Sequence, residues 1–276
     1  MNNLLPSSLA MVPFVSVENM MRLVNTLGAP KMIAEICKYI EADFRRWPEF
    51  DKTPRVAAHS EEGVIELMPT SDGEFYGFKY VNGHPANMAR GFQTVTAFGV
   101  LANVGNGYPV LFSEMTILTA LRTAATSALA AKYLAPKEAR VMGMIGNGAQ
   151  CEFQALAFNE IIGIETVRLY DLDPQATKKA AQNLRNSNLN VVVCKSAEEA
   201  ITGVDIITTC TADKQNATVL TDNMVGSGVH INAIGGDCPG KTELHKDILL
   251  RSDIFVESPP QTRAEGEIQA LDPEFP

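Results

Sequence analysis

The sequence predicts an α/β protein with a Rossmann-type, doubly wound parallel sheet in its C-terminal half and an N-terminal α+β domain before it. Three observations support this fold class. The apolar run Val141–Ile145 ends abruptly in a glycine turn, and a helix-compatible segment follows it. Further apolar runs then alternate with helical segments at the spacing of βαβ units, which is typical of a parallel sheet. Before Thr116, short β-prone segments follow one another directly, which indicates an antiparallel or mixed sheet.

In the N-terminal half, residues 1–50 are predicted to be mostly helical, because apolar residues from Ile33 to Ile40 recur at helical spacing. Pro48 ends this pattern. From Thr116, an alanine-rich helix is expected to run to just before Pro136. We place a domain boundary inside this helix, near Thr123, so that residues 1–122 and 123–276 form two domains. Strands separated by Gly, Pro, Asp and Asn are predicted at 55–59, 63–68, 75–81, 93–101 and 109–112.

In the C-terminal half, strands and helices are predicted to alternate. One helix is expected to begin at Pro174, and a short one is expected after Ser196, which is a good helix-capping residue. Strands are predicted at 141–145, 167–170, 190–194, 204–209, 230–234 and 253–257.

The glycine turn after the first of these strands indicates a dinucleotide site. Gly146 lets the chain turn tightly, and Gly148 lets the backbone approach a pyrophosphate. The helix that opens near Ala149 and Gln150 offers unpaired N–H groups and the positive end of its dipole. The third glycine of the usual GxGxxG pattern is replaced by Cys151, which we interpret as a small-residue variant at a helix–strand contact.

An acidic residue, Asp171, follows the second strand of this βαβ unit. A carboxylate at this position can accept hydrogen bonds from both hydroxyls of the adenine ribose. A 2′-phosphate would meet a like charge there. The sequence therefore predicts that the cofactor is NAD rather than NADP.

Composition limits the possible partners and the compartment. A net charge of −9 without long runs of like charge argues against nucleic acid or an anionic membrane as a partner. Five cysteines without CxxC spacing fit a reduced, cytoplasmic protein, and the N-terminus has no signal-peptide pattern. No stretch approaches the roughly 18 apolar residues of a membrane span. The histidines lack metal-ligand spacing, so no metal site is predicted.

A second group of chemically capable residues lies between the fifth strand and the next helix, from Gly235 to Glu243. Ligands of open α/β sheets bind beyond the carboxyl ends of the strands, so this loop is predicted to face the cofactor. Its glycines allow unusual backbone angles and close approach to a ligand. Asp237 can point at the nicotinamide ring; the alternative is a turn-forming Asp close to a Pro, and position alone does not decide between them.

Several of these motifs, taken together, resemble one family. IGNGAQ, LRTAATSALAAKYLA, GFKYVNGHP and above all NAIGGDCPGKTEL resemble the ornithine cyclodeaminase and mu-crystallin family. RVAAHSEEGVIELMPTSDG and PPQTRAEGEIQ are similar to its bacterial ornithine cyclodeaminases, and the resemblance runs from Phe44 to Phe275. It implies a redox-neutral conversion of L-ornithine to L-proline with release of ammonia, NAD as the catalytic cofactor, and a homodimer formed through the N-terminal sheet.

The resemblance also implies roles for individual residues. Asp237 corresponds to the catalytic acid–base, and Glu66 to a second acid that holds an amine of the substrate or the water beside it. Without the resemblance, a lone Arg or Lys is more often a solvated surface charge, and a lone Thr in a strand is more often a packing residue. The implied substrate-binding residues are Arg55, Glu66, Met68, Lys79 and Arg122; the implied cofactor-binding residues are Thr94, Arg122, Gly146, Gly148, Ala149, Gln150, Asp171, Thr211, Ile234, Gly235, Gly236, Asp237 and Lys241.

By the same resemblance, residues 1–122 are a substrate-binding and dimerisation domain, residues 123–276 are an NAD-binding domain, and a further C-terminal segment is expected beyond the part that matches Gln269–Phe275. Two other functions stay open on the same scaffold. One is an amino-acid dehydrogenase or cyclic ketimine reductase, which changes the amount of NADH. The other is a non-catalytic nucleotide-binding protein like mu-crystallin. Lysine also remains open as a substrate, because a pocket discriminates one methylene by only about 1–3 kcal/mol.

Overall fold

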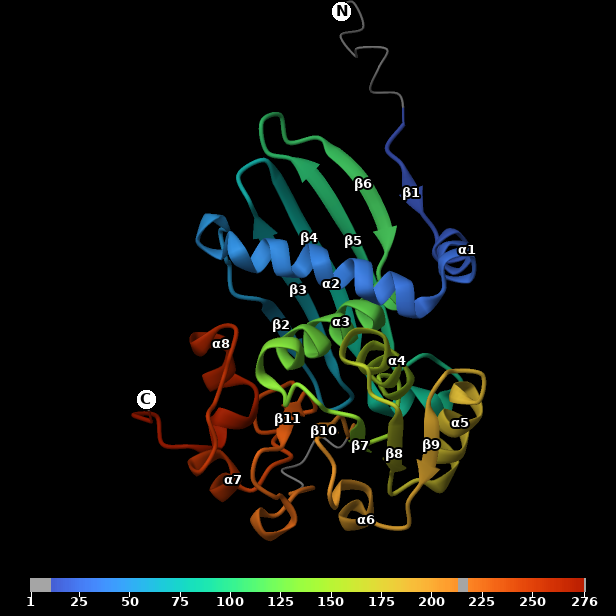
Figure 1. The fold of residues 1–276 in the computed structure, drawn as a ribbon. Coiled ribbons are helices and arrows are strands. Elements are labelled where there is room, and N and C mark those ends of the chain that lie inside the picture. Colours follow the sequence, from blue (N-terminus) through green and yellow to red (C-terminus); the bar gives the residue numbers. More distant parts are fainter. Residues whose placement is uncertain (1–10, 213–217, 276) are drawn as a thin grey trace, which may run out of the picture. The chain divides into compact units, whose positions relative to one another are not determined.

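The computed structural model describes residues 11–212 and 218–275 (Figure 1). By its internal contacts the chain divides into two compact units. The first comprises Met1–Gly28 and Tyr39–Leu121, and the second comprises Ala29–Lys38 and Arg122–Pro276. The predicted domain boundary near Thr123 stays a prediction.

The first unit contains a six-stranded sheet in the order β1-β6-β5-β4-β3-β2. Strands β2 to β6 pair antiparallel with one another in succession, so the predicted β-prone segments do form one sheet. The sequence did not predict β1, a two-residue strand parallel to β6, because so short a strand has no readable period. The strands are β1 (Phe14–Val15), β2 (Val56–His59), β3 (Val64–Ser71), β4 (Phe75–Gly83), β5 (Val95–Asn103) and β6 (Pro109–Glu114).

The predicted helical character of the N-terminal region is confirmed for its described part, while residues 1–10 lie outside the described residues. Helix α1 (Val17–Leu27) begins where the Ser16 side chain accepts the Asn19 N–H at 3.2 Å. Helix α2 (Ala29–Arg45) follows after Gly28. The alanine-rich helix is α3 (Thr116–Leu134). Helices α2 and α3 each contribute residues to both units.

The second unit contains a five-stranded, all-parallel sheet in the order β11-β10-β7-β8-β9. From β7 the chain first adds β8 and β9 on one side, then returns to place β10 and β11 on the other. This order reverses between β7 and β10, which is where open α/β sheets bind ligands. The strands are β7 (Val141–Ile145), β8 (Thr166–Tyr170), β9 (Asn190–Val193), β10 (Ile206–Thr209) and β11 (His230–Ala233).

Two helices of the second unit begin where the sequence predicts them, at Pro174 and after Ser196. The Asp173 side chain caps the helix that opens at Pro174, and the Ser196 side chain accepts the Glu199 N–H at 3.1 Å. The Rossmann-type fold class is therefore confirmed. The helices are α4 (Cys151–Ile162), α5 (Pro174–Leu184), α6 (Ala197–Ile201), α7 (Lys246–Leu250) and α8 (Pro259–Ala264).

The prediction of a sixth strand at 253–257 is wrong. These residues form no strand, and none of the sheet ladders in the described part of the chain includes them. Phe255 is exposed rather than packed in a sheet. An apolar, β-prone run becomes a strand only when its N–H and C=O groups pair with a neighbour, and a sequence pattern does not report that pairing.

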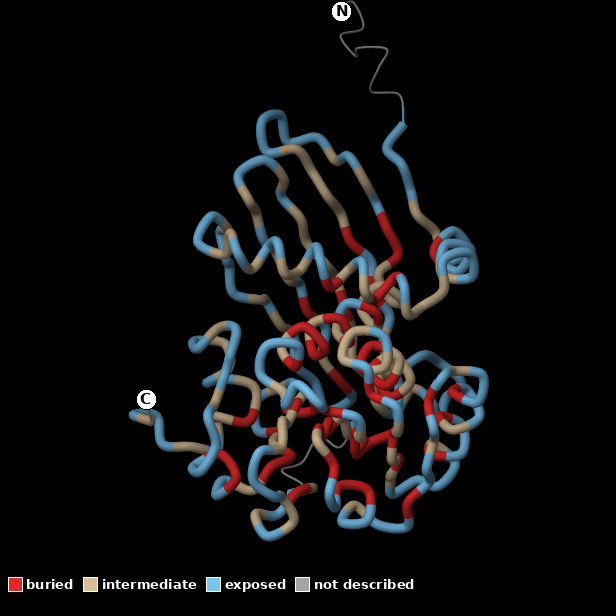
Figure 2. Tube along the Cα trace, viewed as in Figure 1, coloured by how far each residue is buried: buried red, intermediate tan, exposed pale blue. Residues whose placement is uncertain are grey.

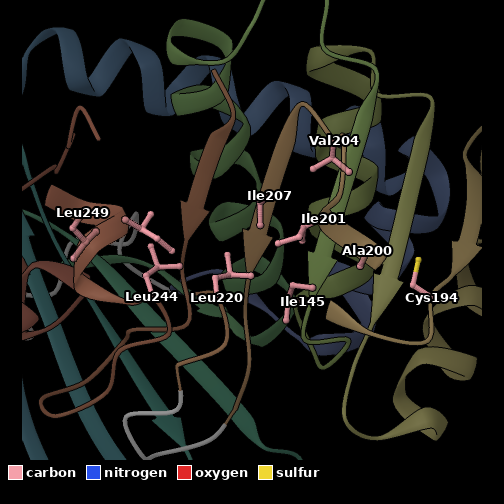
Figure 3. Packing of buried hydrophobic residues seen from close by; sticks show 10 residues of the cluster. Ile145, Cys194, Ala200, Ile201, Val204, Ile207, Leu220, Leu244 and Leu249 are labelled. Carbon is pink, nitrogen blue, oxygen red and sulfur yellow. The ribbon is translucent and has the colours of Figure 1, made fainter. Parts of the chain in front are cut away.

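The parallel sheet has a continuous apolar core on one of its faces. Ile145 of β7 and Ile207 of β10 pack there with Ile201 of α6, as Figure 3 shows. Leu220 and Leu244 extend this cluster toward α7. The central strands β7 and β10 are largely buried, as expected for a parallel sheet covered on both faces, whereas the edge strand β9 is mostly exposed (Figure 2). This core holds the carboxyl ends of β7, β10 and β11 in fixed register.

Candidate functional site

The glycine turn at the end of β7 has the geometry of a dinucleotide-binding turn. Gly146 has a φ of +93°, and a Cβ atom there would lie 2.7 Å from the carbonyl carbon and oxygen of Cys210. Glycine is therefore required at this close approach of β7 to the end of β10. Gly148 is different, because a Cβ atom there would meet nothing within 4 Å. The exposed Gly148 thus leaves open space at the start of α4.

Ala149 and Gln150 form the turn that leads into α4, with Gln150 at the N-cap position. The first N–H groups of a helix have no partner within the helix, and its dipole is positive at this end. The open space at Gly148 therefore lies beside anion-binding groups. This arrangement fits the pyrophosphate of NAD.

The carboxylate of Asp171 is held by backbone N–H groups at the end of β8. Its Oδ2 accepts the Asn147 N–H at 2.6 Å, and its Oδ1 accepts the Asp173 N–H at 2.8 Å. Asn147 is fully buried and donates its side-chain N–H to Thr177 Oγ1 at 2.9 Å, which ties the turn to α5. Each carboxylate oxygen of Asp171 retains a lone pair, so binding of the two ribose hydroxyls is compatible with this geometry.

The cysteines near this turn are structural rather than nucleophilic. Cys151, which replaces the third glycine of the pattern, is fully buried, and burial raises the pKa of its thiol well above the ordinary range. Burial also raises the pKa of the Cys210 thiol, which donates to the Gly146 carbonyl at 3.0 Å. Both groups are therefore neutral thiols at physiological pH.

The loop after β11 brings several predicted residues together. The N–H groups of Ile234 and Gly235 both donate to the Thr209 carbonyl at 3.1 Å, which fixes the loop to the end of β10. Lys241 Nζ then donates to Asp237 Oδ1 at 2.9 Å and to the Thr211 carbonyl at 3.0 Å. The Lys241 side chain is 6% exposed and that of Asp237 is 68% exposed. A buried ammonium therefore holds an accessible carboxylate.

Two buried carboxylates beneath this loop, Glu243 and Glu267, carry no predicted role, although both lie within segments that the sequence singled out. Glu243 Oε1 accepts both the N–H and the hydroxyl of Thr211, at 2.7 and 2.5 Å. Glu267 accepts the N–H groups of Glu243 and Leu244 at 2.9 Å each. Burial raises the pKa of Glu267 from its ordinary 4.5 to about 7, and the charge of Glu243 adds to this effect.

These carboxylates revise the interpretation of the loop glycines. A Cβ atom at Gly235 would lie 2.1 Å from the Glu243 carboxyl carbon, and one at Gly236 would lie 2.8 Å from Glu267 Oε1. Only Gly240 of the three loop glycines has a positive φ. Gly235 and Gly236 therefore make room for buried carboxylates. In a sequence, a glycine followed by an acid in the same loop can therefore indicate a buried carboxylate that packs against the glycine.

In the first unit, the substrate-side residues share one face of the sheet. Arg55 Nη1 donates to Glu66 Oε1 at 3.0 Å, and both side chains are largely buried. Met68 lies two residues beyond Glu66 on β3 and therefore on the same face, and it pairs with Lys79 of β4. The structure thus brings Arg55, Glu66, Met68 and Lys79 together. The assignment of these residues to substrate stays a prediction.

Two further predicted residues lie on other parts of the chain. Thr94 lies directly before β5, and its carbonyl accepts the His84 N–H at 2.9 Å. Arg122 is an exposed residue of α3 and belongs to the second unit. Their roles at the nicotinamide and the substrate carboxylate remain predictions.

The described ranges, 11–212 and 218–275, contain neither a helix that could span a membrane nor a cluster of metal-ligating side chains. None of their helices is long and apolar enough to cross a bilayer. They also contain no group of three His, Cys, Asp or Glu side chains that could hold a metal ion.

The parallel sheet, the glycine turn at its switch point and the held Asp171 define a dinucleotide-binding protein of the Rossmann type. The chain belongs to the ornithine cyclodeaminase/mu-crystallin family, whose model matches residues 17–276.

Three relatives place it within that family. An ornithine cyclodeaminase of Brucella suis is 71% identical over 269 residues, covering 98% of this chain and 75% of the relative. The structure of a lysine cyclodeaminase, described as recognising L-lysine, L-ornithine and L-2,4-diaminobutyric acid, is 28% identical with a TM-score of 0.89, covering 95% of this chain and 78% of that one. An archaeal alanine dehydrogenase dimer with bound NAD is 32% identical with a TM-score of 0.82, covering 94% and 78%.

Proposed function

We propose that this chain is an ornithine cyclodeaminase, which converts L-ornithine to L-proline and ammonia and uses NAD as a cofactor that ends unchanged. The observation that carries the proposal is the loop after β11, where the buried ammonium of Lys241 holds the accessible carboxylate of Asp237. The high identity to a Brucella ornithine cyclodeaminase over nearly the whole chain supports it.

The cofactor is held by groups of the second unit. The turn at Gly146 and Gly148 and the start of α4 bind the pyrophosphate, and Asp171 binds the adenine ribose. Thr211, Lys241 and the backbone from Ile234 to Asp237 contact the nicotinamide end, together with Thr94 and Arg122. When bound, NAD takes a hydride from the substrate α-carbon and returns it to the cyclic imine, so no net NADH is formed.

The substrate α-carboxylate binds to Arg55, Lys79 and Arg122. Guanidinium and ammonium groups suit this task, because charge-assisted hydrogen bonds to a carboxylate both bind and orient it. The orientation of the α-carbon is what makes the reaction efficient. Glu66, held by Arg55 in an ion pair, binds an amine of the substrate or the water next to it, and Met68 forms part of the pocket wall.

Asp237 moves the protons. The α-amine of ornithine must lose a proton as it becomes an imine, and the δ-amine must be neutral before its nitrogen attacks the imine carbon. The carboxylate of Asp237 accepts the proton of the α-amine. The δ-amine gives its proton to Asp237, once the first proton has passed to solvent, or to water near Glu66, and the proton held by Asp237 goes to the leaving ammonia. Lys241 fixes the carboxylate during these transfers, so Asp237 is both accessible and oriented.

The deciding experiment is mass spectrometry of the products from L-ornithine with a catalytic amount of NAD, while NADH is followed by absorbance. Proline and ammonia in equal amounts, many per NAD and without net NADH, are expected. Net NADH would indicate an amino-acid dehydrogenase, the alternative that the likeness to an alanine dehydrogenase favours. NAD binding without any product would indicate a non-catalytic relative of mu-crystallin.

A pair of variants tests the base. Asp237→Asn cannot accept a proton, so turnover should fall by roughly 10²–10⁴-fold while NAD affinity changes little. Asp253→Asn, at an exposed position elsewhere in the second unit, is the matched control. Turnover of Asp237→Asn within a few-fold of the parent would return Asp237 to a turn residue and make Glu66 the base.

We infer that the protein is a homodimer formed through the face of the first unit's sheet that carries Leu67, Tyr80 and Phe98. Leu67, Tyr80 and Phe98 lie directly opposite one another in the ladder, and the rings of Tyr80 and Phe98 stack with centroids 4.9 Å apart. Phe98 is 48% exposed, and Leu67 and Phe112 are also exposed. Such an apolar face usually marks an interface. A monomeric mass in analytical ultracentrifugation at micromolar concentration would contradict this.

We also infer a reducing compartment, the cytoplasm. All five cysteines lie in the described ranges, and none of them forms a disulfide there. Recovery of the protein with the cytoplasmic fraction, its thiols fully reduced by mass spectrometry, is expected; recovery outside the cytoplasm would refute the inference.

A further inference from the structure

Glu243 is a buried acid that the proposed reaction does not use. It is 1% exposed, and its Oε1 accepts two hydrogen bonds from Thr211, at 2.7 and 2.5 Å. Its Oε2 is also buried and has no hydrogen-bond partner within the described ranges. A buried carboxylate is costly unless it is paired. The position of this group therefore requires an explanation.

A chain of contacts connects Glu243 to the catalytic loop. Glu243 binds the N–H and hydroxyl of Thr211, and the carbonyl of Thr211 accepts Lys241 Nζ at 3.0 Å. The same ammonium donates to Asp237 Oδ1 at 2.9 Å. On its other side, the Glu243 carboxyl group fills the space where a Cβ atom of Gly235 would lie. Glu243 thus contacts the loop directly at Gly235 and indirectly through Thr211.

We propose that Glu243 is a positioning residue for Asp237: it fixes the end of β10 against the loop after β11 and shares the positive charge of Lys241 with Asp237. The proposal rests on the proposed function in that it takes Asp237 as the catalytic acid–base. Glu243 itself touches neither Asp237 nor the substrate.

The charges near Glu243 explain how this residue can influence Asp237. Glu243 and Lys241 both interact electrostatically with Glu267 of the 3₁₀ helix Glu267–Ala270 and with Cys210 at the end of β10, and Asp237 enters this group through its ion pair with Lys241. Among them Lys241 carries the positive charge. In this proposal the negative charge of Glu243 offsets part of the charge of Lys241, so that Asp237 remains free to accept a proton. Without Glu243, Lys241 still donates to the Thr211 carbonyl but is bound more firmly to Asp237.

Two variants separate geometry from charge. Glu243→Gln retains an oxygen that can accept the hydrogen bonds of Thr211 but removes the negative charge. Glu243→Ala removes both. Glu160→Gln, at an exposed position of α4, is the matched control. For each protein, the measurements are kcat and KM for L-ornithine from low to high pH, NAD affinity, and hydrogen exchange of Thr211 and residues 235–241 by mass spectrometry.

In Glu243→Gln we expect KM, NAD affinity and hydrogen exchange to stay within about twofold of the parent. Its kcat should fall several-fold, and the acid side of the kcat profile should move about half to one pH unit lower, because loss of a nearby negative charge favours ionised Asp237. In Glu243→Ala we expect exchange in 235–241 to rise about tenfold or more and kcat to fall roughly 10–100-fold.

An unchanged pH profile and kcat in Glu243→Gln would overturn the charge-sharing proposal, and this variant decides the matter if Glu243→Ala does not fold. Unchanged exchange in a folded Glu243→Ala would overturn the positioning role. Hydrogen exchange needs no catalysis, so the positioning role of Glu243 and the assignment of Asp237 as the base can be refuted independently. If Asp237→Asn turns over ornithine normally, the assignment of the base fails, while exchange in Glu243→Ala still tests the support of the loop.

Discussion

Replacing Glu267 by Gln should remove a pH-dependent loss of stability. Burial and the nearby charge of Glu243 raise the pKa of Glu267 from 4.5 to about 7 in the folded protein, whereas unfolding exposes the carboxyl group to water. Between these two values the folded protein binds a proton that the unfolded chain has already released. The free energy of unfolding therefore falls as the pH rises from 4.5 toward 7, and Glu267 adds no further pH dependence above that range.

The size of the effect follows from the pKa difference. One unit of pKa corresponds to about 1.4 kcal/mol, so the rise from 4.5 to about 7 corresponds to about 3 kcal/mol in total. From about pH 5.5 to about pH 8, roughly 2 kcal/mol of this is lost. Burial lowers the pKa of His230, and this shift changes the stability with pH in the opposite direction at acid pH. His230 is present in both parent and variant, so its contribution cancels when their free energies of unfolding are subtracted.

The assay is urea unfolding of parent, Glu267→Gln and the exposed control Glu160→Gln at about pH 5.5 and about pH 8. The amide removes one acceptor for the N–H groups of Glu243 and Leu244, so Glu267→Gln should be less stable than the parent at the lower pH. Its disadvantage should shrink by about 2 kcal/mol at the higher pH. Parallel pH dependences in variant and parent would refute the raised pKa and the burial that causes it.

The other predictions concern binding. In Asp171→Ser, the preference for NAD over NADP should fall about tenfold or more, because the like charge facing a 2′-phosphate is removed; equal affinities of the parent for both cofactors, measured by fluorescence titration, would contradict the assignment. In Arg122→Ala, kcat/KM for L-ornithine should fall about 10–100-fold through loss of charge-assisted hydrogen bonds. Arg185→Ala, which changes another exposed arginine, is the control. If kcat/KM of Arg122→Ala falls no further than that of the control, Arg122 is a surface charge and not a substrate-binding residue.

Elements with a strong local pattern could be predicted from the sequence, and elements that depend on distant partners could not. The run Val141–Ile145 is apolar and ends at a glycine turn, so its strand and the following helix were predicted within one or two residues. The run 253–257 looks equally β-prone, but it has no paired neighbour. The two-residue strand Phe14–Val15 forms only because β6 lies beside it.

The same distinction holds for the candidate functional site. The turn glycines, Asp171 and Asp237 lie at motif positions next to strand ends, where sequence order alone indicates proximity. Glu267 lies far along the chain from the loop it supports, and it reaches Glu243 and Leu244 only through the tertiary fold. Its sequence neighbourhood contains no periodic pattern that indicates burial.

The loop after β11 shows why its glycines and its acids require one another. Gly235 and Gly236 leave the space that the carboxyl groups of Glu243 and Glu267 occupy, and any larger residue there would displace those groups. The carboxyl groups in turn bind N–H groups that would otherwise be buried without partners, those of Thr211 and Leu244 among them. Buried acids therefore hold the loop in place. The carboxylate of Asp237, bound by Lys241, is the exposed acid of this loop. A rigid support beneath an accessible acid is what a proton-transferring residue needs, because its orientation must not change as its charge does.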